Sequence, residues 1–122
     1  MRLQQEPLEA ELAHLESLWE GGIEDAYTHY AALSESRVAL AAALVEAGIA
    51  LHGLGHGAAP PGELLLSDLC LARASRLAAA WATREVQVGL ALAIEEASGA
   101  AAAGRTSEPI RRRLTAVLQG AS

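Results

Sequence analysis

The sequence predicts an all-α protein, a single domain over residues 1–122 built as a bundle of about five or six helices. Hydrophobic residues form 52% of the chain, yet Phe is absent and Ala and Leu dominate the apolar content. Both are strong helix formers, whereas the β-branched and aromatic residues that favour strands are few. Apolar residues also recur at steps of three and four, which is the helical period.

Three helices are expected in the first half. Apolar residues at helical spacing predict a first helix that stops at Gly21 and Gly22; they are Leu8, Leu12, Leu15 and Trp19. A second stripe runs up to Ser34 and comprises Ile23, Ala26, Tyr27, Tyr30 and Leu33. Ser34 or Ser36 is expected to cap a third helix reaching Leu51. That helix is apolar nearly all round, which predicts a central position.

Three more helices are expected after the Gly- and Pro-rich loop 52–62. The first runs from Glu63 to Trp81, with Leu64, Leu65, Leu69, Leu77, Ala78 and Trp81 turned inward. Thr83 is expected to cap the next helix, which buries Val86, Leu90, Ala93, Ile94 and Ala97. This helix is expected to end at Gly99, and the Ala- and Gly-rich stretch that follows either extends it or forms a linker. Ser107 is expected to cap the last helix, whose apolar side carries Ile110, Leu114, Val117 and Leu118.

Charge and hydropathy exclude several classes of protein. A net charge of −6 disfavours nucleic-acid binding, which needs a basic face. The longest apolar run, Val38 to Leu51, is interrupted by Glu46 and is shorter than the roughly 20 residues of a membrane span. The polar, acidic start of the chain is unlike a signal peptide, and Cys70 has no partner for a disulfide. We therefore expect a cytoplasmic protein without a transmembrane segment.

The side chains that could carry chemistry are isolated. His52 and His56 are four residues apart but lie among glycines, so a small metalloenzyme built on them is the least favoured interpretation. Cys70 lies in an apolar register, which favours a buried thiol over a nucleophile. Arg111 to Arg113 crowd a helix start, a poor place for cations unless a partner neutralises them. We therefore predict no catalytic, cofactor-binding or metal-binding residues.

The run ELLLSDLCLARASRLAA, Glu63 to Ala79, resembles a helix of trans-polyprenyl diphosphate synthases that usually reads L-x-G-D-x-L-L-x-x-A. Asp68 matches the aspartate, and Ser67 stands where glycine is usual. The preceding helix resembles the one that leads into the family's aspartate-rich motif, typically H-D-D-x-x-D. His52 matches the histidine, but Gly53 and Leu54 replace the two aspartates. The likeness covers about residues 34–104 and implies part of the isoprenoid synthase fold.

The departures from the family pattern shape the functional expectation. Synthases of this family hold Mg²⁺ on two aspartate-rich motifs, because a hard cation needs oxygen ligands to neutralise the leaving diphosphate. The sequence has lost the first motif and ends before the second. Some family members pair a catalytic large subunit with a degenerate small subunit that helps to set product chain length. The resemblance therefore implies a non-catalytic subunit without cofactor, with Mg²⁺ only on its catalytic partner.

Small-residue helices suit close packing against a partner helix. The residues expected at the partner interface are Leu44, Leu65, Asp68, Ala72 and Ala74. A homodimer in isolation is also expected, since the apolar content is large for the size of the chain. The rival hypothesis is a helical homodimeric scaffold or adaptor with no prenyl-related role.

Overall fold

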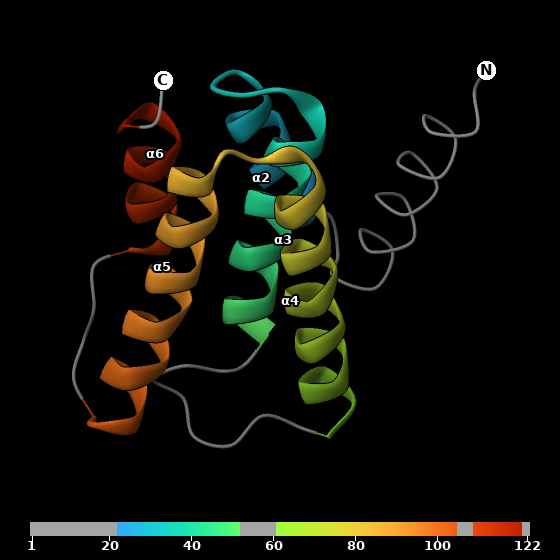
Figure 1. The fold of residues 1–122 in the computed structure, drawn as a ribbon. Helices are drawn as coiled ribbons and strands as arrows, with labels where there is room; N and C mark the ends of the chain where they lie inside the picture. The colour runs from blue at the N-terminus through green and yellow to red at the C-terminus, as the bar shows by residue number, and fades with distance from the viewer. Residues whose placement is uncertain (1–21, 52–60, 105–108, 121–122) are drawn as a thin grey trace.

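The computed structural model describes residues 22–51, 61–104 and 109–120 (Figure 1). These ranges contain no strand and form helices labelled as in Figure 1: α2 (Gly22–Ala31), α3 (Ser36–Leu51), α4 (Pro61–Trp81), α5 (Arg84–Ala102) and α6 (Ile110–Gly120). The all-α class is thereby confirmed. The helix expected over Leu8 to Trp19, the loop histidines and the Ser107 cap lie outside the described residues.

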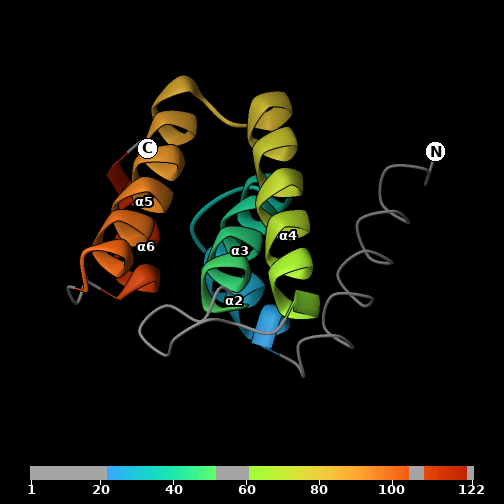
Figure 2. The ribbon, with the colours of Figure 1, turned by 90° about the horizontal axis from the view of Figure 1, so that it is seen from below.

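Helix α3 occupies the centre of the bundle (Figures 1 and 2). Twelve of its 16 residues are buried, and α2, α4, α5 and α6 all contact it. A helix that is apolar on every side is stable in water only when neighbours cover all of those sides. The central position expected for this segment is therefore confirmed, and α4 packs beside it.

The start of α3 differs from the sequence expectation. The Glu35 carboxylate, rather than a serine hydroxyl, accepts hydrogen bonds from the backbone amides of Arg37 at 2.9 Å and Val38 at 3.2 Å. The Glu35 carbonyl also accepts from the Ala39 amide at 2.9 Å. Glu35 therefore satisfies amides that would otherwise be unpaired at the helix start. The prediction of a Ser34 or Ser36 cap was wrong.

The two ends of α5 had different outcomes. Thr83 caps its start as expected, because the Thr83 hydroxyl accepts from the Val86 amide at 3.3 Å. At its other end α5 continues past Gly99 to Ala102, so the stretch after Gly99 extends the helix rather than forming a linker. Gly104 follows with a φ of +69°, a left-handed conformation that glycine adopts without steric cost.

The inward face of α4 is made of small residues, which corrects the sequence expectation. Leu65, Leu69 and Trp81 were expected to be buried but are 72%, 40% and 47% exposed. The Arg37 guanidinium lies 4.2 Å from the centroid of the Trp81 ring and covers part of it. The buried residues of α4 are Ser67, Cys70, Ala74 and Ala78, of which Cys70 and Ala78 were expected. Leu77, also expected inward, packs partly buried against the core.

The close approach of α3 and α4 at Gly48 explains this choice of face. The Ser67 hydroxyl donates a 2.6 Å hydrogen bond to the Gly48 carbonyl oxygen. A Cβ added at Gly48 would lie 2.8 Å from the Leu71 side chain and 3.2 Å from the Ser67 carbonyl oxygen. Two helices this close bury Ser, Cys and Ala fully between them, whereas Leu66, Leu71 and Leu77 of α4 are only partly buried against the core. Side-chain size therefore decided which face of α4 turned inward.

One polar network ties α6 to the centre. Arg111 Nε lies 3.1 Å from Glu46 Oε1, and its Nη2 lies 2.8 Å from Glu46 Oε2. Arg111 Nη1 also donates to Asp25 at 2.9 Å, and the Tyr30 hydroxyl donates to Glu46 at 2.7 Å. The crowding of cations at the start of α6 is thus relieved within the chain. Arg113 contributes as well, by pairing with Glu96 of α5.

The buried side of α6 agrees with the sequence expectation. Leu114 and Leu118 are buried, while Ile110 and Val117 pack partly buried against the same core. Val117 also lies against α5 at Gly89, where an added Cβ would come within 2.6 Å of its side chain. Helices α5 and α6 therefore also meet closely at a glycine.

The Gly48 contact predicts opposite effects for two glycine substitutions. Gly99→Ala should raise the free energy of unfolding by up to about 1 kcal/mol, because Ala is the better helix former. No atom lies within 4 Å of the Cβ it would introduce. Gly48→Ala should instead lower it by about 1–2 kcal/mol, since overpacking outweighs the propensity gain. Urea unfolding followed by circular dichroism measures both, and a stabilised Gly48→Ala variant would contradict the close approach.

Removal of the Arg111 side chain should separate its role from that of a surface arginine. Arg111→Met leaves the largely buried Glu46 carboxylate without its cation, and should cost about 1–2 kcal/mol of unfolding free energy. Arg112 is exposed, so Arg112→Met should change it by less than about 0.5 kcal/mol. Equal effects in urea unfolding would show that the network contributes nothing specific.

The buried Tyr30 hydroxyl predicts a loss of stability at alkaline pH. Burial raises the pKa of Tyr30 well above its usual range, and the hydrogen bond to Glu46 raises it further. Above about pH 10 the unfolded chain releases this tyrosine proton while the native state keeps it. The free energy of unfolding should then fall with a slope approaching about 1.4 kcal/mol per pH unit. Tyr30→Phe should flatten that slope in urea unfolding between about pH 9 and pH 11; an unchanged slope would contradict this prediction.

Candidate binding surface

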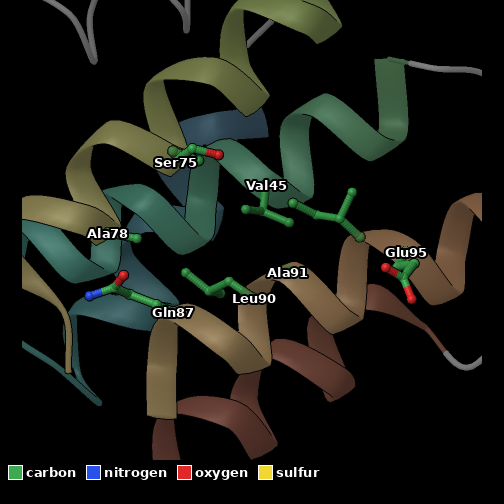
Figure 3. A pocket seen from close by; sticks show the side chains of 9 residues that line it. Val45, Ser75, Ala78, Gln87, Leu90, Ala91 and Glu95 are labelled. Atoms are coloured by element: carbon green, nitrogen blue, oxygen red, sulfur yellow. The ribbon is translucent and has the colours of Figure 1, made fainter. Parts of the chain in front are cut away.

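Helices α4 and α5 enclose a groove whose floor is α3 (Figure 3). The two helices are joined by Ala82 and Thr83 and separate from each other away from that turn (Figure 2). The groove has a volume of about 490 Å³. Its walls are formed by Val45, Ala74, Ser75, Ala78, Gln87, Leu90, Ala91, Ile94 and Glu95.

The groove is apolar at its floor and polar at its edges. Val45 is 1% exposed and forms the floor, and the alanines of both walls keep the groove open because they carry so little volume. Gln87 lies near the turn, where its side-chain amide donates to the Ala82 carbonyl oxygen at 3.1 Å. Glu95 lies at the opposite end of the groove (Figure 3).

Large exposed apolar side chains gather on the same two helices. Within the described residues, all of them belong to α4 or α5: Leu65, Leu69, Trp81, Val88 and Leu92. Val88 and Leu92, each about half exposed, share a helical face with Ala91 and Glu95 of the groove wall. Exposed Leu65 and Ala72 share the outer face of α4. The groove and these faces together form what we call the α4–α5 surface.

The structure separates the five residues expected at a partner interface. Leu65, Asp68 and Ala72 are exposed on α4, beside the groove residue Ser75. Ala74 is only 2% exposed, but it lines the groove. Leu44 is 0% exposed inside the core and does not line the groove. The expectation for Leu44 is corrected, because its side chain is fully buried in the core and offers no surface to a partner.

The other candidate residues offer no assembled reactive centre where they can be described. Cys70 is buried at 1% exposure, as expected for a small apolar side chain. His29 Nε2 lies 2.8 Å from the Thr115 hydroxyl oxygen. Among the described residues, no three or more His, Cys, Asp or Glu side chains are grouped to hold a metal ion. His52 and His56 lie outside the described ranges.

No helix in the described ranges is both long and apolar enough to cross a membrane. The 16-residue α3 is the most apolar described helix, and neighbouring helices bury it.

Sequence reasoning missed the groove itself. Its α5 wall, formed by Gln87, Leu90, Ala91, Ile94 and Glu95, had been assigned only a buried stripe. A signal was present, because Val88 and Leu92 are apolar yet lie outside the stripe that contains Val86 and Leu90. Surplus apolar residues beside a buried stripe indicate a second contact surface.

Comparisons of the chain with models of protein families, with curated proteins and with solved structures found no match. The likeness to polyprenyl diphosphate synthases therefore stays a prediction that rests on the motif residues. Of these, Ser67 is buried and bonded to Gly48 where the helices meet, while its neighbour Asp68 is exposed. The two residues have separate roles, since one faces α3 and the other faces solvent.

Proposed function

We propose that this chain is a non-catalytic accessory subunit that binds a catalytic polyprenyl diphosphate synthase subunit and influences its product chain length. The observation that carries the binding role is the concentration of exposed apolar side chains on α4 and α5. Leu65 is 72% exposed, and Val88 and Leu92 are 49% and 50% exposed. Apolar side chains gathered beside a groove are typical of surfaces that contact another molecule.

The energetics of this surface suit protein association. Covering a large apolar side chain that is now half exposed removes apolar area from water, and contributes about 1 kcal/mol for each such residue. A stable interface buries on the order of 800 Å² per partner, which requires a surface spanning more than one helix. Helices α4 and α5, with 21 and 19 residues, offer that length. The small residues beside the groove let a partner helix approach closely.

The identity of the partner is supported by the resemblance alone. The helix from Glu63 to Ala79 resembles a synthase helix, while Gly53 and Leu54 stand where Mg²⁺-binding aspartates are usual. A chain with this pattern fits the degenerate subunit of a heterodimeric synthase. Mg²⁺ would then be held by the partner, whose carboxylates supply the hard oxygen ligands.

A homodimeric scaffold or adaptor is the second candidate function, because the same α4–α5 surface is available to a second copy of the chain. The two candidates differ in the effect of a synthase on the assembly. An accessory subunit exchanges its self-association for a complex with the catalytic subunit, whereas a scaffold stays homodimeric. Analytical ultracentrifugation with and without a co-expressed synthase encoded beside the gene separates them.

Charged substitutions on the α4–α5 surface should abolish association without unfolding the chain. Leu65→Asp and Leu92→Asp each place a carboxylate in a contact that would be desolvated, and should weaken binding at least tenfold. Ala116→Asp on exposed α6 is the matched control and should bind like the unsubstituted chain. Co-purification with the synthase and sedimentation of the chain alone provide the measurements. Retained binding by both leucine variants would exclude this surface.

The purified chain alone should not turn over allylic and homoallylic diphosphates. Gly53 and Leu54 have no side-chain oxygen with which to ligate Mg²⁺ where the family uses aspartates. Adding the chain to its catalytic partner should shift the distribution of product chain lengths, measured by chromatography of the dephosphorylated products. Turnover by the chain alone would overturn the accessory role.

A further inference from the structure

The groove between α3, α4 and α5 has the size and lining of a small-molecule site. Its volume of about 490 Å³ lies within the range of about 300–1,000 Å³ that such sites occupy. Six of its nine lining residues are apolar: Val45, Ala74, Ala78, Leu90, Ala91 and Ile94. The groove is also elongated, with Gln87 and Glu95 at opposite ends (Figure 3). An apolar chain laid along this floor would be removed from water over much of its length.

The charges around the groove are negative at the end away from the turn. Glu95 is the ionisable side chain among the lining residues, and no basic residue lines the groove. Asp68 lies on α4 at about the same distance from the α4–α5 turn as Glu95 does on α5. At 1.5 Å per residue, each is about 17–20 Å along its helix from that turn. The Arg113 guanidinium of α6 is paired with Glu96, the residue after Glu95. The net charge of −6 strengthens this preference for cations.

We propose that this groove binds a single-chain amphiphile with a cationic head group. The apolar chain lies on Val45, Leu90 and Ile94, and the head group lies beside the Glu95 carboxylate. Gln87 is already bonded to the Ala82 carbonyl oxygen, so the end near the turn receives the tail. This site is independent of the proposed function, because it needs neither a synthase nor a second copy of the chain.

The same chemistry rejects anionic ligands. A carboxylate, sulfate or diphosphate head group at this end would lie beside Glu95, with no cation in the lining to compensate it. A neutral alcohol of the same chain length would keep the apolar contacts but lose the attraction to Glu95. Head-group charge is therefore the property that discriminates ligands at this site.

The test compares dodecylammonium, dodecanol and dodecanoate, which share one chain and differ in charge. Binding to the full chain is measured by displacement of the neutral dye Nile red, with every amphiphile below its critical micelle concentration. We expect dodecylammonium to bind more tightly than dodecanol by about twofold to fivefold, and dodecanoate to bind most weakly. Shortening the ammonium compound from dodecyl to decyl should weaken binding by about fourfold to fifteenfold. Added salt should reduce the advantage of the ammonium compound.

Matched variants assign the binding to the groove. Glu95→Gln should remove the preference for dodecylammonium over dodecanol, while Glu85→Gln, on an exposed α5 residue outside the groove, should keep it. Ala91→Trp places a large ring at the groove wall and should reduce the affinity for all three amphiphiles at least tenfold. Ala116→Trp on exposed α6 is its control. Both alanines are exposed, so circular dichroism should show an intact fold for each variant.

Three outcomes would overturn the proposal. One is dodecanoate binding as tightly as dodecylammonium, and another is an equal effect of Glu85→Gln and Glu95→Gln. The third is no amphiphile binding while Ala91→Trp abolishes self-association or synthase binding, which would make the groove a protein interface. The proposed function fails separately, through loss of synthase association, and that result leaves the amphiphile measurements unaffected.

Discussion

The pairing of Glu46 with Arg111 is the contact that joins three helices of the bundle. Helix α3 is apolar and buried on nearly all sides, yet it carries the charged Glu46, whose side chain is only 13% exposed. A carboxylate in that position is costly unless charged and hydrogen-bonding partners surround it. Arg111 supplies two of these contacts and Tyr30 a third. The same arginine reaches Asp25, so α2, α3 and α6 are tied together at one point.

A second constraint, the size of the residues between α3 and α4, determines what the surface looks like. Gly48 and Ser67 bring the two helices together, and the small side chains of α4 therefore turn inward. Its leucines at 65 and 69 consequently turn outward. The exposed apolar surface is thus a direct result of close packing inside the bundle.

The groove follows from the same arrangement. Both α4 and α5 pack on α3, but the two helices diverge from each other away from their connecting turn (Figure 2). Alanines at 74, 78 and 91 are too small to fill the space between them, and Val45 closes it from below. A proposed partner surface and a proposed ligand site therefore lie on the same two helices. One is defined by exposed leucine and valine side chains, and the other by the charge of Glu95.

Much of the architecture could be predicted without coordinates. The helical class, the central α3, the Thr83 cap and the buried stripes of α5 and α6 follow from local period and propensity, which a sequence displays directly. The candidate site was only partly predictable. Four of the residues expected at an interface lie at the surface or in the groove: Leu65, Asp68, Ala72 and Ala74. The fifth, Leu44, lies in the core, and Glu95 was not selected from the sequence.

By itself, the sequence determined the number and type of the described helices and the apolar character of α3, because these depend on residues close together in the chain. Only the tertiary structure decided which face of α4 is buried, which carboxylates neutralise the arginines of α6 and where a groove remains open. Those outcomes depend on pairs such as Gly48 with Leu71 and Arg111 with Glu46, far apart in sequence. Hydropathy ranks leucine above serine as an interior residue, but steric exclusion between two close helices acts on volume. At the contact between α3 and α4, side-chain volume therefore placed Ser67 inside and left Leu65 and Leu69 at the surface.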